Sequence, residues 1–158
     1  MNNSNNQIVE CVPNFSEGKS KDIIDLISQE IINEKGVTLL DVDMGYDTNR
    51  TVITFAGNPC SVINAAYNAI KKASQLIDMK NHFGTHPRMG ATDVCPLIPI
   101  SNISMDECIE YSKKLAKRVG RELKIPVFLY EKSASSKNRV NLADIRKGEY
   151  EYMKRKIS

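Results

Sequence analysis

The spacing of hydrophobic residues changes several times along this chain, and the order of the changes restricts the folds open to it. Short apolar or β-branched runs at residues 8–12, 37–42 and 51–55 are typical of strands. Apolar residues three or four positions apart over residues 22–31 and 59–77 indicate amphipathic helices. With a further strand expected within residues 91–100, the first six elements follow the order β-α-β-β-α-β.

Capping signals mark where the helices begin. Asn58-Pro59 is typical of an N-cap followed by proline at the first helical position. Ser104-Met-Asp-Glu107 is a capping-box pattern that opens a third helix. Beyond it, Pro126–Tyr130 predicts a last strand, and residues 142–156 predict a short terminal helix around Gly148.

This order of elements contains the split β-α-β-β-α-β arrangement. We therefore expect an α/β (α+β) protein with a ferredoxin-like core, in which a mixed sheet carries its helices on one face. The strands at residues 37–42 and 51–55 should pair antiparallel because a short loop joins them. Residues 8–158 should form a single domain, preceded by a disordered leader at residues 1–7.

The composition excludes several functional classes. The 22 basic and 19 acidic residues give a net charge of +3, which offers little support for nucleic-acid binding. No apolar run is long enough to span a membrane, and the leader lacks the features of a signal peptide, so we expect a cytoplasmic protein. The four cysteines have no C-x-x-C spacing and are interpreted as reduced thiols.

The two histidines are the strongest chemical signal. His82 and His86 lie four residues apart in an expected loop that also carries Arg88 and Asp93. A histidine titrates near neutral pH, so either one could act as a general acid or base, although an ordinary polar loop residue is the alternative interpretation.

A metal site is not expected at these histidines. A four-residue spacing brings two imidazoles together only on a helix, and Gly84 and Pro87 argue against helical structure here. No glutamate occupies the inner positions of a metalloprotease motif.

Other polar positions are less specific. The loop Asn14-Phe-Ser-Glu-Gly18 could present N–H groups to an anion, but an ordinary β-to-α turn explains it equally well. Arg50 could hold a carboxylate in a bidentate pair or be a solvated strand end. Asp43 and Asn49 flank an expected hairpin loop, where such residues are common turn formers.

Several segments resemble the formiminotransferase family, in order and with compatible spacing, over about residues 8–152. The clearest are Glu10-Cys-Val-Pro-Asn-Phe-Ser-Glu-Gly18, His86-Pro-Arg-Met-Gly-Ala91, Asp93-Val-Cys-Pro96 and Ile145-Arg-Lys-Gly-Glu-Tyr150. The resemblance implies transfer of a formimino group from N-formimino-L-glutamate to tetrahydrofolate, a step in histidine breakdown. Tetrahydrofolate would be a co-substrate, and no metal is implied.

The resemblance also implies roles for individual residues. His86, directly before Pro-Arg, would be the catalytic histidine, which takes a proton from the attacking amine and returns one to the departing glutamate nitrogen. By analogy with serine proteases, Asp43 would orient its ring. Substrate or folate contacts would come from Asn14, Asn49, Arg50, Arg88 and His82.

The family's transferase module has two similar subdomains with folate between them, and this chain resembles only the first. We therefore expect small-molecule substrates, and either a homodimer or pairing with a C-terminal subdomain. The alternative is a non-catalytic folate-binding or interaction protein derived from the same family. Whether the transferred group is formimino or formyl stays open.

Overall fold

Strand β4 (Arg50–Gly57) is central in the six-stranded sheet of the computed structural model, which describes residues 6–157. Strand β3 (Val37–Gly45) pairs with it on one side. On the other side, β1 (Ile8–Cys11) and β2 (Asn14–Phe15) follow one another along β4. They act as one strand, interrupted where Pro13 cannot donate a ladder hydrogen bond.

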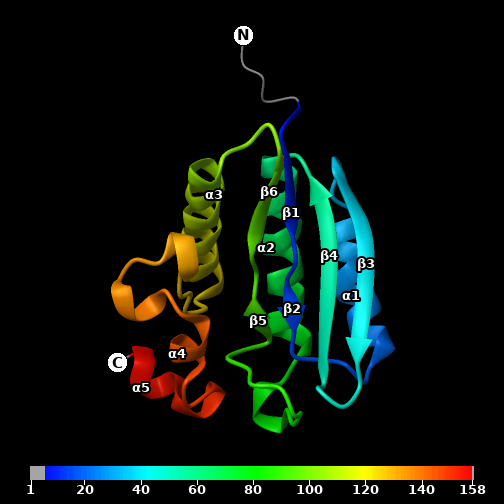
Figure 1. Cartoon of the computed structure of the whole chain (residues 1–158). Coiled ribbons are helices and arrows are strands. Elements are labelled where there is room, and N and C mark those ends of the chain that lie inside the picture. The colour runs from blue at the N-terminus through cyan, green and yellow to red at the C-terminus, as the bar shows by residue number, and fades with distance from the viewer. Residues whose placement is uncertain (1–5, 158) are drawn as a thin grey trace.

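A second interrupted strand completes the sheet. Strand β6 (Leu97–Ser101) pairs with β1, and β5 (Thr92–Val94) pairs with β2 (Figure 1). Every pairing between described strands is antiparallel. The α+β class and the hairpin of β3 and β4 are confirmed, but the prediction of a mixed sheet is wrong. β1 and β3 point the same way, yet β4 lies between them.

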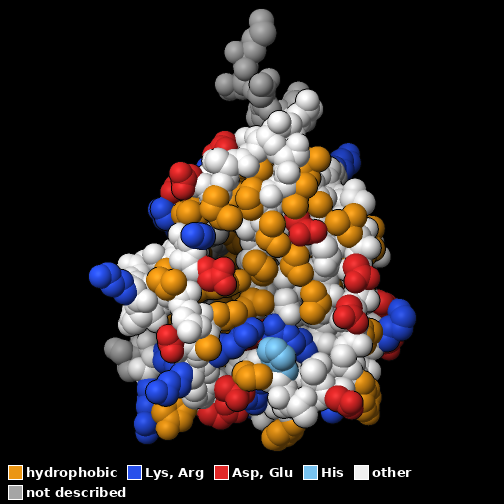
Figure 2. Space-filling model, in the orientation of Figure 1, with side chains coloured by type: hydrophobic (Ala, Val, Ile, Leu, Met, Phe, Trp, Pro, Cys, Tyr) orange, Lys and Arg blue, Asp and Glu red, His pale blue; other side chains and the backbone are white. Residues whose placement is uncertain are grey.

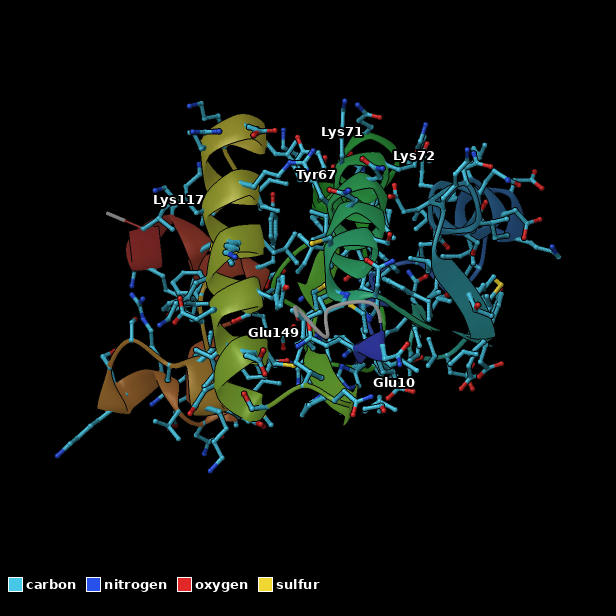
Figure 3. The ribbon with its side chains drawn as sticks, turned by 90° about the horizontal axis from the view of Figure 1, so that it is seen from above. Glu10, Tyr67, Lys71, Lys72, Lys117 and Glu149 are labelled. Carbon is cyan, nitrogen blue, oxygen red and sulfur yellow. The ribbon has the colours of Figure 1, made fainter. Side chains whose placement is uncertain are left out.

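Helices α1 (Lys21–Ile32) and α2 (Pro59–Leu76) cover one face of this sheet (Figure 1; seen from above in Figure 3). Their apolar stripes meet the inward side chains of the strands, which alternate with outward ones because a strand has a period of two. The largest buried side chains of this core are Val9, Phe15, Ile24, Ile27, Ile31, Ile53, Phe55 and Val62. Asn58 caps α2 by accepting a hydrogen bond from the Ser61 N–H at 3.0 Å, as predicted.

Helix α3 (Met105–Arg118) lies beside the β6 edge of the sheet (Figure 1). Both hydrogen bonds of the predicted capping box between Ser104 and Glu107 are present. The prediction of a strand at Pro126–Tyr130 is wrong, because this segment pairs with no described strand. It is separated from β6 by a cavity of about 630 Å³.

The C-terminal segment returns toward the sheet as short pieces. Helix α4 (Leu142–Arg146) is followed by a 3₁₀ turn at Tyr150–Tyr152 and by α5 (Met153–Ile157). A single helix over residues 142–156 is not formed, because Lys147 leaves the helical conformation with a ψ of 120° and Gly148 follows it with a φ of 81°. Of the leader predicted at residues 1–7, residues 1–5 lie outside the described part, whereas Gln7 donates a 3.0 Å hydrogen bond to Glu107.

The other face of the sheet carries none of the described helices. Its outward side chains include Val52, Val94, Ile98 and Ile100, and Figure 2 shows hydrophobic side chains gathered there. Ile100 is 55% exposed. Among the described residues, none of the helices has the length and apolar character needed to cross a membrane.

Gly18, in the loop before α1, allows the β3–β4 turn to approach the backbone closely. A Cβ atom there would lie 2.2 Å from the Gly45 oxygen and 2.6 Å from the Arg50 nitrogen. We predict that Gly18→Ala lowers the free energy of unfolding by about 1–3 kcal/mol, measured by urea denaturation. Gly120→Ala is the control, since its Cβ would meet only the Ile125 oxygen at 3.8 Å. Equal stability of the two variants would contradict the prediction.

Candidate active site

The loop that the sequence predicted between α2 and the next strand is present at residues 82–91. It lies at the end of the sheet where β2, β4 and β5 meet (Figure 1). Ser16 ties this loop down with two hydrogen bonds. Its hydroxyl donates to the Gly90 carbonyl at 2.8 Å, and its N–H donates to the Ala91 carbonyl at 2.9 Å. The loop also crosses the β3–β4 turn closely, because a Cβ at Gly84 would lie 2.2 Å from the Thr48 oxygen.

Asn49 joins three segments beneath this loop. Its side-chain oxygen accepts from the Gly18 N–H, and its amide donates to the Phe83 carbonyl, each at 2.9 Å. Asn49 is buried and adopts a φ of 48°, a left-handed conformation that asparagine tolerates better than most residues. Its described contacts are therefore structural ones, where the sequence predicted a substrate contact.

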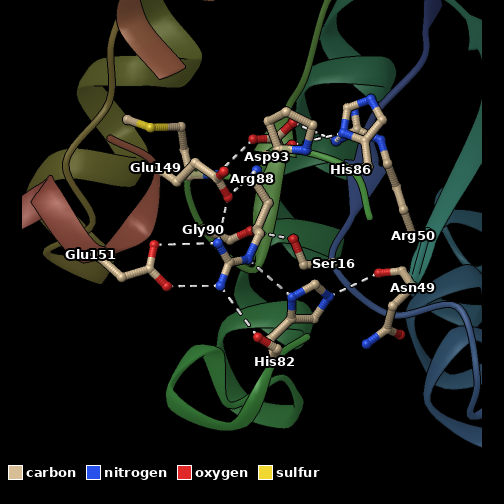
Figure 4. Close-up of polar contacts among 12 residues, drawn as sticks. Ser16, Asn49, Arg50, His82, His86, Arg88, Gly90, Asp93, Glu149 and Glu151 are labelled. Carbon is tan, nitrogen blue, oxygen red and sulfur yellow. Dashed lines mark hydrogen bonds and ion pairs between the residues drawn. The ribbon is translucent and has the colours of Figure 1, made fainter. Parts of the chain in front are cut away.

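His82 is buried, and both of its ring nitrogens have a hydrogen-bond partner. Nδ1 faces the Arg88 Nε–H at 3.2 Å, and Nε2 lies 2.8 Å from the Asn49 carbonyl oxygen (Figure 4). Arginine can only donate, so Nδ1 must accept, and Nε2 must carry the hydrogen that the carbonyl oxygen accepts. Both ring nitrogens of His82 are thus used within the protein.

Arg88 uses its whole guanidinium within the protein. Its five N–H groups match five hydrogen bonds: one to His82 Nδ1, one to the His82 carbonyl, two to Glu151 and one to Glu149 (Figure 4). Burial alone would lower the pKa of Arg88, but the hydrogen bonds to Glu151 and Glu149 outweigh it and raise this pKa. The same hydrogen bond from Arg88 lowers the pKa of Glu151. The sequence predicted a substrate contact for Arg88, and here no donor is left for one.

His86 is more exposed than His82, and its Nδ1 contacts two groups. The Pro87 carbonyl oxygen is 2.7 Å away, and Arg50 Nη1 is 3.3 Å away. Nδ1 can donate to the first or accept from the second. Nε2 makes no hydrogen bond with any described residue, so one ring nitrogen is held while the other is available for proton transfer.

Arg50 is held in place by two further side chains. Its Nε donates to Asn14 Oδ1 at 2.9 Å, and its Nη1 donates to Asp93 Oδ2 at 2.5 Å. The Asp93 side chain has no exposed surface, and it also accepts from Arg146 Nη2 at 2.5 Å and from the Met89 N–H at 2.7 Å. The structure thus brings together three of the predicted residues, Asn14, Arg50 and His86, around an acid that was not selected as a site residue.

No hydrogen bond joins Asp43 to His86 in the described part of the chain. Asp43 is exposed on β3, where it pairs with Val52, and Val52 in turn pairs with Asn14. Asp43 therefore shares the uncovered face of the sheet with Asn14 and Arg50, but it makes no hydrogen bond or ion pair with a described residue. Its predicted role in orienting His86 stays a prediction.

Sequence reasoning missed the acids and the arginine that complete this site. Asp93 was visible as the only acid in the histidine loop, and its position at the start of a strand was a usable signal. Arg146, Glu149 and Glu151 are more than 50 residues from the groups they contact, so the fold alone reveals these contacts, although Arg146 and Glu149 lie in a segment that resembles the family. Within residues 6–157, no cluster of three or more histidine, cysteine, aspartate or glutamate side chains could hold a metal ion.

Comparison with known proteins shows which family the chain matches. The family model of the formiminotransferase domain, N-terminal subdomain, matches residues 8–158. The formimidoyltransferase-cyclodeaminases of Dictyostelium discoideum and Rattus norvegicus are each 53% identical to the chain over 96% of its length, which is 28% of theirs. The glutamate formimidoyltransferase of Streptococcus pyogenes serotype M1 is 50% identical over 96% of this chain and 50% of its own length. The chain thus spans half or less of these relatives.

The buried ion pairs of Asp93 give a stability prediction. Replacing Asp93 with asparagine leaves two partly buried guanidinium groups without their counter-charge, so we expect a loss of about 3–5 kcal/mol in the free energy of unfolding. Asp25→Asn is the matched control, because Asp25 pairs with Lys21 at an exposed position and should change stability by less than about 1 kcal/mol. Urea titration of both variants measures the free energy of unfolding. A loss for Asp93→Asn as small as that for Asp25→Asn would show that the ion pairs of Asp93 do not stabilise the fold.

Proposed function

Because this chain belongs to the formiminotransferase family, we propose that it forms the N-terminal half of an enzyme that moves a formimino group from N-formimino-L-glutamate to tetrahydrofolate. In metabolism, this reaction would be a step in the breakdown of histidine. The observation that carries the proposal is His86, whose Nδ1 is held by neighbouring groups while Nε2 bonds to none of residues 6–157.

One histidine can serve both halves of the transfer. His86 Nε2 takes the proton from the folate amine as its nitrogen bonds to the formimino carbon. It then gives a proton to the glutamate nitrogen as the old carbon–nitrogen bond breaks, so the histidine returns to its starting state. Arg50 Nη1 lies against Nδ1 and Arg50 Nε against Asn14, which limits the directions the ring can take.

The uncovered face of the sheet supports a partner for this half. The hydrophobic side chains of that face lie above basic side chains and a histidine at the surface (Figure 2). A ligand at such a place keeps much of its surface in water unless a second body covers it, which costs affinity and positioning. We propose that a C-terminal subdomain or a second copy of the chain provides this cover.

A second candidate function follows from the lengths of the relatives. A chain that spans 28% to 50% of their lengths could bind folate without catalysing transfer. A measurement of turnover distinguishes the two candidate functions. Incubating the purified chain with tetrahydrofolate and formiminoglutamate, alone and with the separately produced C-terminal half of the Streptococcus pyogenes enzyme, would give product only if the chain is catalytic. Tetrahydrofolate binding measured by calorimetry, without turnover in either mixture, would favour the binding protein.

We predict that His86→Ala lowers the rate of transfer at least about 10²-fold, the effect expected for a positioned acid–base group. Lys80→Ala is the control, because Lys80 is exposed just before the loop and its backbone carries its hydrogen bond. Both are measured as steady-state rates of product formation in the active mixture. A His86→Ala variant with wild-type turnover would remove His86 from the mechanism.

Asp43 has a separate test. We propose that its carboxylate faces the reacting groups across the uncovered face, so Asp43→Asn should lower kcat about 10-fold, equivalent to about 1.4 kcal/mol of transition-state interaction. Its free energy of unfolding should change by less than about 0.5 kcal/mol, because Asp43 is exposed. Unchanged kcat would show that Asp43 has no part in transfer.

A further inference from the structure

Two arginines converge on one buried carboxylate beside His86. Arg50 comes from the start of β4 and Arg146 from the end of α4, and both donate to the same oxygen of Asp93 at 2.5 Å. The Arg50 side chain is 11% exposed and that of Arg146 is 18% exposed. Two positive charges against one negative charge leave an excess of one positive charge in a partly buried place, where it is screened less than at the surface.

The two guanidinium groups also have donors to spare. Arg50 Nη2 and Arg146 Nη1 make no hydrogen bond with a described residue. Arg146 Nε is buried and has no partner at all, one of three such side-chain atoms in the described part of the chain. Because buried polar groups are nearly always hydrogen-bonded, an unused buried donor indicates a missing acceptor.

The neighbouring cations narrow the choice of where an anion would bind. Arg88 has all five of its N–H groups in use, so it cannot take a ligand without giving up Glu149, Glu151 or His82. Lys156 donates to the Ile145 carbonyl oxygen, which is uncharged, so the positive charge of its ammonium adds to that of Arg146. The N–H donors that could bind an anion therefore lie on the side of the loop where Arg50 and Arg146 are.

We propose that Arg50 and Arg146 together bind a carboxylate of the ligand that reacts at His86. An arginine fork matches the two oxygens of a carboxylate, and Arg50 Nη1 is 3.3 Å from His86 Nδ1, so a carboxylate held by this pair would lie next to the acid–base group. That this carboxylate belongs to a glutamyl group rests on the proposed function. The binding of a carboxylate by these two residues does not.

The test uses glutarate, a dicarboxylate without the reactive formimino group. Calorimetric titration of the purified chain with glutarate should show binding that weakens about 10- to 100-fold in Arg146→Met, the effect of losing a hydrogen-bonded charge. Arg121→Met is the matched control, because Arg121 is 72% exposed and should leave the affinity unchanged. Glutaramide, which has no charge, should bind no more weakly to Arg146→Met than to the original chain.

Arg146→Lys keeps the charge and loses the fork, so it covers the case in which Arg146→Met fails to fold. It should bind glutarate more weakly than the original chain and more tightly than Arg146→Met. The signals of the His86 ring in NMR spectra should shift on addition of glutarate to the original chain. Wild-type affinity in the folded Arg146 variants, or no binding of glutarate by the original chain, would overturn the proposal.

The outcome does not depend on catalysis. Glutarate binding that requires Arg146, in a chain that transfers no formimino group under any condition, would sustain the carboxylate site and refute the proposed function. Transfer whose KM for formiminoglutamate is the same in the original chain and in Arg146→Lys would sustain the proposed function and refute the carboxylate site.

Discussion

The carboxylate of Asp93 is the group on which the candidate site depends. It joins the start of β4, the histidine loop and the end of α4 through Arg50, the Met89 N–H and Arg146. Buried ion pairs contribute little net stability on average, because removing charges from water costs as much as their attraction returns. Their effect here is on geometry, since any other arrangement of these segments would leave a buried charge without a partner.

The two histidines, four residues apart, differ in their hydrogen bonds because the groups around them differ. His82 lies between a carbonyl oxygen and an arginine, and each of its two ring nitrogens is hydrogen-bonded to one of them. His86 has Nδ1 against Pro87 and Arg50, and its Nε2 makes no hydrogen bond within the described part of the chain. The sequence presents the two residues as equals, and the difference between them arises from burial and from which partners the fold supplies.

Local signals predicted most of the secondary structure, because a cap or an apolar stripe depends on neighbours in sequence. Asn58 and the Ser104–Glu107 capping box are examples, and the hairpin of β3 and β4 follows from a short connection. The segment Pro126–Tyr130 has the composition of a strand but no partner to pair with, which composition does not reveal. In the site, Asn14, Arg50 and His86 were predicted and meet. Arg88 was predicted to contact substrate, yet it bonds Glu149 and Glu151, which are distant in sequence.

The acids that saturate Arg88 follow every strand of the sheet along the chain, and this order matters during synthesis on the ribosome. A nascent chain that has emerged through β6 carries the whole sheet and both histidines, but neither Arg146 nor Glu149. Because domains generally fold as units, the charges of this loop would stay unpaired until the last segment has been made. Ser16 and Asn49 would already contact the loop, whereas Arg88 and Asp93 would gain Glu149 and Arg146 last, so a ribosome stalled after β6 would hold a chain whose site is unfinished.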